Sequence, residues 1–136
     1  MKIVFQLLLI VVLSFLFYLF LTREVYLTVM TSGHSMEPNF HDGGRLSASK
    51  LPFMWRNPHK GDVVLIREYY GINMGDGLID IKRIAAVGGD TVTNKNGVIT
   101  IPKDQYYVLG DNAEVSFDSR FYGPLHKDQV LAIVNQ

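Results

Sequence analysis

One serine in the sequence, Ser35, has the surroundings that a nucleophile requires. It lies in the segment TSGHSMEP at residues 31–38, directly after a run of β-forming residues. Gly33 permits a sharp bend, Pro38 fixes the chain that leaves it, and such a turn can direct backbone N–H groups at a developing oxyanion. A serine attacks a carbonyl only when a neighbouring base removes its proton. Without a base, the segment is more typical of an ordinary turn.

The candidate base is Lys82, in the run LIDIKRIAAV at residues 78–87. A lysine accepts a proton only as the neutral amine, and burial among apolar side chains disfavours the ammonium. Neighbouring side chains of a strand face opposite ways, so Lys82 can be enclosed among Ile and Val while Arg83 has a different role. A lysine without a partner is more often a solvated residue at a sheet edge.

A polar segment, GDNAEVSFDSR at residues 110–120, supplies further candidates. If this segment is buried, its acidic groups need partners, and Arg83 or Arg120 can pair with Asp111 or Asp118 through charge-assisted hydrogen bonds. The alternative is a turn whose polar groups satisfy one another.

Short runs of Val, Ile, Thr and Tyr, separated by Gly, Asn, Asp and Pro, must position these residues. This pattern predicts a mainly β fold. The eight predicted strands are residues 25–31, 45–48, 62–67, 78–87, 91–93, 98–101, 106–109 and 130–134. The segment NKNG at 94–97 predicts a hairpin turn. Residues 49–60 predict a surface loop, in which Trp55 is either buried or in contact with a membrane interface.

The N-terminal run at residues 3–21, IVFQLLLIVVLSFLFYLFL, carries no charge. Its length fits the hydrocarbon core of a bilayer, which predicts a transmembrane helix. A cleaved signal peptide is the alternative, but the run is long and LTRE at 21–24 offers no small-residue cleavage site. Residues 1–23 are therefore predicted to be a membrane anchor, followed at 24–136 by one compact β-barrel-like domain of short strands. The positive charges at the two ends of this run, Lys2 and Arg23, nearly balance, so the charge distribution leaves the orientation in the membrane open.

The composition excludes several classes of function. The chain has 136 residues with 13 basic and 13 acidic side chains, so nucleic acid is not expected as a partner. It contains no cysteine, which removes disulfides, thiolate metal sites and thiol nucleophiles. The histidines show no metal-ligand spacing, so no metal site is expected.

Four segments, in this order, resemble the motifs of the type I signal peptidases, the bacterial Ser-Lys class. They are Ser35-Met36-Glu37-Pro38, Gly61-Asp62-Val63-Val64, Lys82-Arg83 through Gly88-Gly89-Asp90, and Gly110-Asp111-Asn112 through Asp118-Ser119-Arg120. Each is weak evidence alone, but the combination is highly specific. The resemblance covers nearly the whole chain, including the N-terminal apolar run.

The resemblance implies a membrane-bound serine endopeptidase, signal peptidase I, that removes signal peptides from exported preproteins after small residues, through an acyl-enzyme and without a cofactor. It implies a single-pass protein of the cell membrane with its N-terminus in the cytoplasm and its catalytic domain outside, in contact with the lipid bilayer and near the secretion translocon. The implied roles are nucleophile for Ser35, base for Lys82, orientation of the lysine amine for Ser116, structural ion pairing for Asp111, Arg83, Asp118 and Arg120, and substrate-pocket lining for Met36 and Ile81.

Two positions depart from the family pattern. Asn39 stands where Thr is frequent, and Gly33 stands where some members carry a serine that donates to the oxyanion. Ser32 is one residue out of register for that purpose. The oxyanion hole is therefore expected to rely mainly on the backbone N–H of Ser35.

Other functions compete with this interpretation. A Ser-His-Asp triad could use His34, His41, His59 or His126 with Asp42 or Asp62. Ser47-Ala48-Ser49-Lys50 matches the Ser-x-x-Lys signature of penicillin-interacting enzymes, although their other elements are missing. Self-cleaving domains of SOS-type repressors share the dyad but carry a DNA-binding domain in place of the helix. A membrane-tethered β module without activity would be expected to lack Ser35, Lys82 or Ser116.

Overall fold

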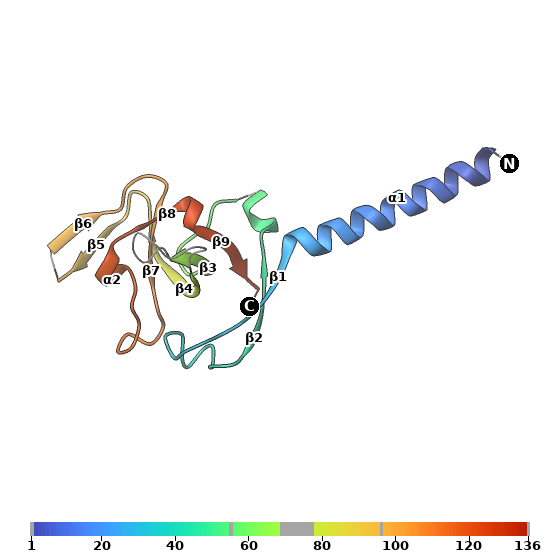
Figure 1. The fold of residues 1–136 in the computed structure, drawn as a ribbon. Coiled ribbons are helices and arrows are strands. Elements are labelled where there is room, and N and C mark those ends of the chain that lie inside the picture. The colour runs from blue at the N-terminus through green and yellow to red at the C-terminus, as the bar shows by residue number, and fades with distance from the viewer. Residues whose placement is uncertain (1, 55, 69–77, 96, 136) are drawn as a thin grey trace.

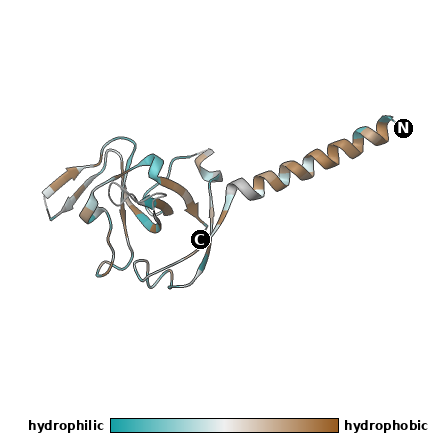
Figure 2. Ribbon diagram, viewed as in Figure 1, coloured by the Kyte–Doolittle hydropathy of each residue, from teal (hydrophilic) through white to brown (hydrophobic). Residues whose placement is uncertain are grey.

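The computed structural model describes residues 2–54, 56–68, 78–95 and 97–135. Helix α1 (Lys2–Val25) projects away from a group of strands (Figure 1). Its part from Lys2 to Thr22 is long and apolar enough to cross a membrane, and none of it is buried against the strands. Figure 2 shows this helix as an almost continuous hydrophobic ribbon. The predicted run at 3–21 is therefore one helix, and it continues to Val25 because Gly and Pro are absent from it.

The strands form one curled, half-barrel sheet and one separate hairpin. All neighbouring strands are antiparallel, and the order in the sheet is β1-β2-β9-β3-β4-β7-β8. Its strands are β1 (Tyr26–Met30), β2 (Arg45–Ser49), β3 (Val63–Glu68), β4 (Leu78–Val87), β7 (Gln105–Leu109), β8 (Leu125–His126) and β9 (Val130–Val134). The hairpin consists of β5 (Thr91–Asn94) and β6 (Gly97–Thr100). The predicted mainly β fold with an N-terminal apolar helix is confirmed.

All eight predicted strands are present, and each of their ends matches the prediction or shifts by one residue. Four short elements are additional: the strand β8, the helix α2 (Ser119–Tyr122) and the 3-10 turns η1 (Leu51–Met54) and η2 (Lys127–Gln129). The turn η1 lies within the predicted loop 49–60, whereas Trp55 lies outside the described residues. Asn94 pairs with Gly97 across the predicted hairpin turn, and Gly97 has the positive φ of 113° that such a turn requires.

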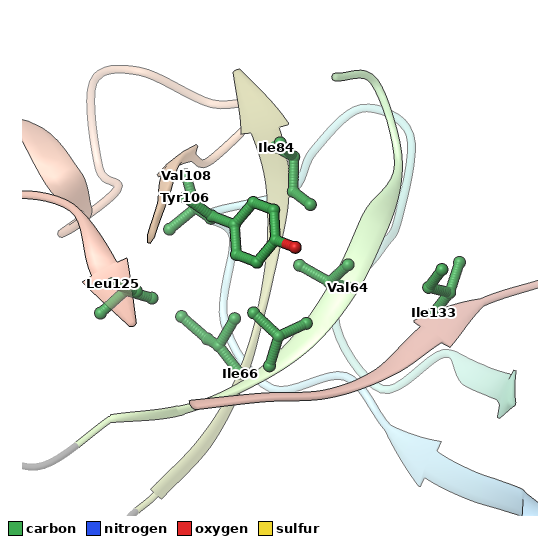
Figure 3. Close-up of a cluster of buried hydrophobic side chains, with 8 residues drawn as sticks. Val64, Ile66, Ile84, Tyr106, Val108, Leu125 and Ile133 are labelled. Atoms are coloured by element: carbon green, nitrogen blue, oxygen red, sulfur yellow. The ribbon is translucent and has the colours of Figure 1, made fainter. Parts of the chain in front are cut away.

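Strand β3 lies at the centre of the packing because both of its faces are buried. Val64 and Ile66 pack on one face with residues from β4, β7, β8 and β9, and Val63 and Leu65 pack on the other with Met36 and Ile81. Figure 3 shows the first cluster, in which the Tyr106 ring lies among aliphatic side chains. Near-continuous apolar runs of this kind are typical of strands covered on both sides. Lys82 pairs with Val64 in this region, so its side chain starts within the core.

Candidate active site

The turn that carries Ser35 follows β1 and is fixed by hydrogen bonds to the chain that leads into β2. The Thr31 hydroxyl donates to the His41 carbonyl at 2.5 Å, and the Thr31 N–H donates to the Gly44 carbonyl at 2.8 Å. Gly33 has a φ of 90°, and its N–H donates to the Asp42 carboxylate at 2.8 Å. The bend predicted at Gly33 is present, and Ser35 is half-buried at its far side.

The amine of Lys82 reaches this turn from β4. The two residues are 47 positions apart in the sequence, yet Lys82 Nζ lies 3.4 Å from Ser35 Oγ. The lysine is only 1% exposed, which is rare for this residue type unless it is paired. Its amine also donates to the Ile81 carbonyl at 3.3 Å and to the Asp80 carboxylate. The fold thus places a buried amine beside an accessible hydroxyl.

The segment after β7 holds the Ser35 turn from the other side. The Asn112 N–H donates to the Ser35 carbonyl at 2.9 Å, and the Asn39 amide donates to Asp111 at 2.8 Å. Gly110, at the start of this segment, has no room for a side chain. A Cβ at this position would lie 2.2 Å from the Ser116 hydroxyl and 2.5 Å from the Ser35 carbonyl oxygen. The close approach of these two segments therefore requires glycine.

Arg83 points away from Lys82, as the alternation of a strand predicts, and pairs with Asp111. Its Nε and Nη2 donate to the two carboxylate oxygens at 2.8 and 2.7 Å, and its Nη1 donates to the Gly61 carbonyl at 3.0 Å. The Arg83 guanidinium, helped by the Asn39 amide, holds the pKa of Asp111 below its usual value despite partial burial. This pair ties β4 to the segment that supports the Ser35 turn.

Asp118 is the most completely enclosed acid of the site, with 0% exposure. Its carboxylate accepts hydrogen bonds from Arg120 Nε at 2.8 Å, Arg120 Nη2 at 2.7 Å, the Ser116 hydroxyl at 2.7 Å and the Gly110 N–H at 3.0 Å. Burial raises the pKa of Asp118, but these hydrogen bonds outweigh that effect and hold the pKa below its usual value. Asp118 therefore organises the loop as a carboxylate.

Ser116 is buried beside the site, but the structure directs its hydroxyl to Asp118. Within the described part of the chain, its hydroxyl has no hydrogen bond to Lys82. The lysine amine is contacted instead by Asp80, which was not among the residues selected from the sequence. Asp80 and Lys82 are two positions apart on one strand, and this spacing places both on the same face.

A small cavity of about 60 Å³ opens next to Ser35. Met36 and Ile81, the two residues expected to line a substrate pocket, both line it, and so does Asp80. Pockets for drug-sized ligands have roughly 300–1,000 Å³. The cavity beside Ser35 is much smaller than such pockets.

The histidines have other partners. His34 Nδ1 contacts Glu37 at 2.9 Å, and this hydrogen bond raises the pKa of His34, which favours the imidazolium form that cannot act as a base. His59 contacts Arg56 at 2.8 Å, and His126 contacts Asp128 at 2.8 Å. Among the described residues, no group of three or more potential ligands could hold a metal ion.

A family model described as "Signal peptidase, peptidase S26" matches residues 2–101 and 97–135. The chain belongs to the S26 signal peptidase family. It is a serine endopeptidase of the signal peptidase I type, and the family supports the removal of signal peptides as its activity. The resemblance recognised in the sequence is confirmed.

Individual signal peptidases also match over most of the chain. The chain is 23% identical to signal peptidase I V of Bacillus subtilis, with 83% of this chain and 86% of the relative covered. It is 28% identical to signal peptidase IB of Staphylococcus aureus, with 86% and 80% covered. Thylakoidal processing peptidase 1 of Arabidopsis thaliana is 30% identical over 71% of this chain and 37% of the relative.

Proposed function

We propose that this S26 signal peptidase cleaves preproteins with a dyad in which Ser35 is the nucleophile and Lys82 is the general base. The observation that carries the proposal is the distance of 3.4 Å between Lys82 Nζ and Ser35 Oγ, together with the 1% exposure of the lysine. Burial in an apolar region disfavours the ammonium form, and the short distance allows direct proton transfer.

The first half of the reaction forms an acyl-enzyme. Neutral Lys82 takes the hydroxyl proton as Ser35 Oγ bonds to the scissile carbonyl carbon, which becomes tetrahedral with a negatively charged oxygen. The backbone N–H of Ser35 has no hydrogen-bond acceptor among the described residues, which leaves it available for that oxygen. The carbon–nitrogen bond then breaks, and the Lys82 ammonium gives its proton to the leaving amine.

The second half releases the signal peptide. Lys82, neutral again, takes a proton from a water molecule as the water oxygen bonds to the ester carbon. The bond from that carbon to Ser35 Oγ breaks, the lysine returns the proton to Oγ, and the product leaves as a carboxylic acid that loses its own proton to solvent. The proton transfers to and from Ser35, the leaving amine and the attacking water are all carried by one amine, so these steps use no metal ion or cofactor.

The remaining site residues hold the dyad in place. Asp111 and Arg83 fix the segment that binds the Ser35 carbonyl, and Asp118 and Arg120 fix the loop that carries Ser116. Ser116 acts through this packing, because its hydroxyl donates to Asp118. Met36 and Ile81 limit the cavity beside Ser35 to small side chains such as Ala. The two ion pairs thus account for the position of the dyad, and the small cavity accounts for the selectivity.

We further propose that residues 1–23 are a single-pass anchor in the cell membrane and residues 24–136 are the peptidase domain. The N-terminus lies in the cytoplasm and the β domain lies outside, where exported preproteins emerge near the translocon. The exposed apolar surface of α1 supports the anchor, since such a surface requires lipid around it. A protease added outside intact cells tests the orientation: digestion of the β domain is expected, and full protection would reverse the assignment.

The decisive test of the dyad replaces the nucleophile. In detergent, Ser35→Ala is expected to lose cleavage of a preprotein while its unfolding temperature stays within a few degrees of the wild type. Ser47→Ala is the matched control, because Ser47 is an exposed serine on β2. It also tests the Ser-x-x-Lys alternative. Persistent cleavage by Ser35→Ala, or loss with Ser47→Ala, would contradict the proposal.

A further inference from the structure

The amine of Lys82 has a partner that the reaction above does not use, the carboxylate of Asp80. Asp80 Oδ2 accepts a hydrogen bond from Lys82 Nζ and forms an ion pair with it. The other carboxylate oxygen, Oδ1, accepts from the Ile81 N–H at 2.6 Å, which fixes the orientation of the carboxylate. The Asp80 carboxylate is therefore held through both of its oxygens, one by the strand backbone and the other by the buried lysine.

The contacts of the amine match its charged form. An ammonium has three donors and no acceptor, and three acceptors surround Lys82 Nζ: Asp80, Ser35 and the Ile81 carbonyl. A general base, in contrast, needs a lone pair directed at the serine hydroxyl. The three contacts therefore suit an amine that donates to each of these oxygens, and the shortest of them is with the Asp80 carboxylate.

The other charged groups around the dyad are already paired with one another. Asp111, on the segment after β7, binds Arg83, and Asp118 binds Arg120. On the nucleophile turn, Glu37 contacts His34, and Asp42 accepts from the Gly33 N–H. At the start of β3, the cross-strand neighbour of β4, Asp62 pairs with Arg56. Among the described residues, Asp80 is thus the acid in direct contact with the catalytic amine.

We propose that Asp80 is a positioning residue that holds Lys82 as an ammonium ion in the resting enzyme and thereby sets the pH at which the base becomes available. This inference rests on the proposed dyad. The carboxylate opposes the effect of burial, so the enzyme needs a more alkaline medium than the buried lysine alone would require. Asp80 is 32% exposed and lines the cavity next to Ser35, which gives solvent access to the pair and limits the size of the effect.

The first experiment measures kcat/KM against pH for the full chain in detergent with a fluorogenic peptide substrate. A neighbouring opposite charge shifts the pH at which a group titrates by about 1–3 units, and the partial exposure of Asp80 favours a shift near one unit. Asp80→Asn is therefore expected to move the ascending limb about one unit towards acid, which is roughly a tenfold gain below the wild-type midpoint. Asp80→Glu is expected to keep the wild-type midpoint.

Two comparisons separate this effect from a loss of structure. Asp80→Thr is a second neutral variant with a residue that suits a strand, and it is expected to move the limb in the same direction. Asp128→Asn, which removes an exposed acid outside the site, is expected to leave the profile unchanged. An unchanged midpoint in both neutral variants, or equal losses at every pH, would overturn the proposal.

The second experiment does not depend on activity. The side-chain carbon signals of isotope-labelled lysine are followed by NMR against pH, and the Lys82 signal is identified by its disappearance in Lys82→Arg. Its titration midpoint is expected to fall by about one unit in Asp80→Asn. A midpoint that stays in place overturns the inference even if Ser35→Ala is inactive. If the Lys82 midpoint falls in Asp80→Asn but the wild-type protein cleaves no peptide, the result supports the ion pair and refutes the proposed dyad.

Discussion

The carbonyl oxygen of Ser35 accepts a 2.9 Å hydrogen bond from the backbone N–H of Asn112. Ser35 is therefore held through its own main chain by the segment that follows β7. Strand β7 pairs with β4, which carries Lys82. The serine and the lysine are thus connected through one antiparallel ladder and one backbone hydrogen bond, and small shifts of residues 110–112 change the distance between them.

Gly110→Ala tests this connection. The new Cβ would lie 2.5 Å from the Ser35 carbonyl oxygen and 2.2 Å from Ser116 Oγ, so the nucleophile turn must move. A displacement of about 1 Å costs on the order of 100-fold in rate, and a loss of kcat of this size is expected in a peptide-cleavage assay. Gly97→Ala is the control, because it strains the hairpin turn where nothing crowds the Cβ. Equal kcat in the two variants would contradict the account.

Lys82→Arg retains the positive charge but removes the base, because a guanidinium does not lose its proton near neutral pH. A loss of kcat of at least about 100-fold is expected, in the range of one general base. The wild type is expected to gain activity as pH rises and Lys82 becomes neutral, whereas the variant stays inactive at every pH. Wild-type turnover by Lys82→Arg would indicate a different base, such as a histidine.

Asp118 is expected to make the fold sensitive to acid. Its pKa in the folded chain lies below the ordinary value of 3.8, so its contribution is present above about pH 4 and is lost as the pH falls through the folded value. At pH 7, Asp118→Asn is expected to cost about 3 kcal/mol, since it leaves Arg120 without its anionic partner. The unfolding temperature should fall by on the order of 10 °C, and the difference should shrink as the pH drops below 3.8.

The control for this experiment is Asp104→Asn, which breaks an exposed ion pair with Lys127. Exposed pairs contribute about 1 kcal/mol or less, and Asn tolerates the positive φ of this position. Its unfolding temperature is expected to stay within a few degrees of the wild type at both pH values. A constant penalty for Asp118→Asn from pH 7 to pH 3 would show that folding does not lower the pKa of Asp118.

Ile81→Ala is expected to enlarge the cavity beside Ser35 and weaken the preference for small residues before the cut. One methylene group is worth roughly 10- to 200-fold in discrimination, so the kcat/KM ratio between Ala and Val substrates should fall by about tenfold. Leu131→Ala, in the same apolar cluster but outside the cavity lining, should lower stability and leave the ratio unchanged. An unchanged ratio for Ile81→Ala would remove this residue from the pocket.

The long elements could be predicted from the sequence because their patterns are local. The uncharged run of α1 and the β-branched runs of β3 and β4 each contain enough residues to identify their structure. Strand β8 has two residues and helix α2 has four, which is too short for any periodicity. These elements form because β7 pairs with Leu125 and because Asp118 caps the helix, and both causes are tertiary or side-chain contacts.

The site was predictable in its residue types more than in its hydrogen bonds. Strand alternation separates Lys82 from Arg83, and it also places Asp80 on the lysine's face. The sequence alone does not reveal that the lysine amine turns back towards that carboxylate. Likewise, the direction of the Ser116 hydroxyl depends on one side-chain rotation, and the structure directs it to Asp118.

Helix α1 ends at Val25 and strand β1 begins at Tyr26, so no spacer separates them. Ser35 follows ten positions after the last helical residue, and an extended chain covers at most about 3.6 Å per residue. With α1 held in lipid, the hydroxyl can act no farther than roughly 35 Å from the end of the helix. The anchor therefore limits cleavage to peptide bonds close to the bilayer surface. Peptide bonds that lie beyond this reach are not cut, whatever their sequence.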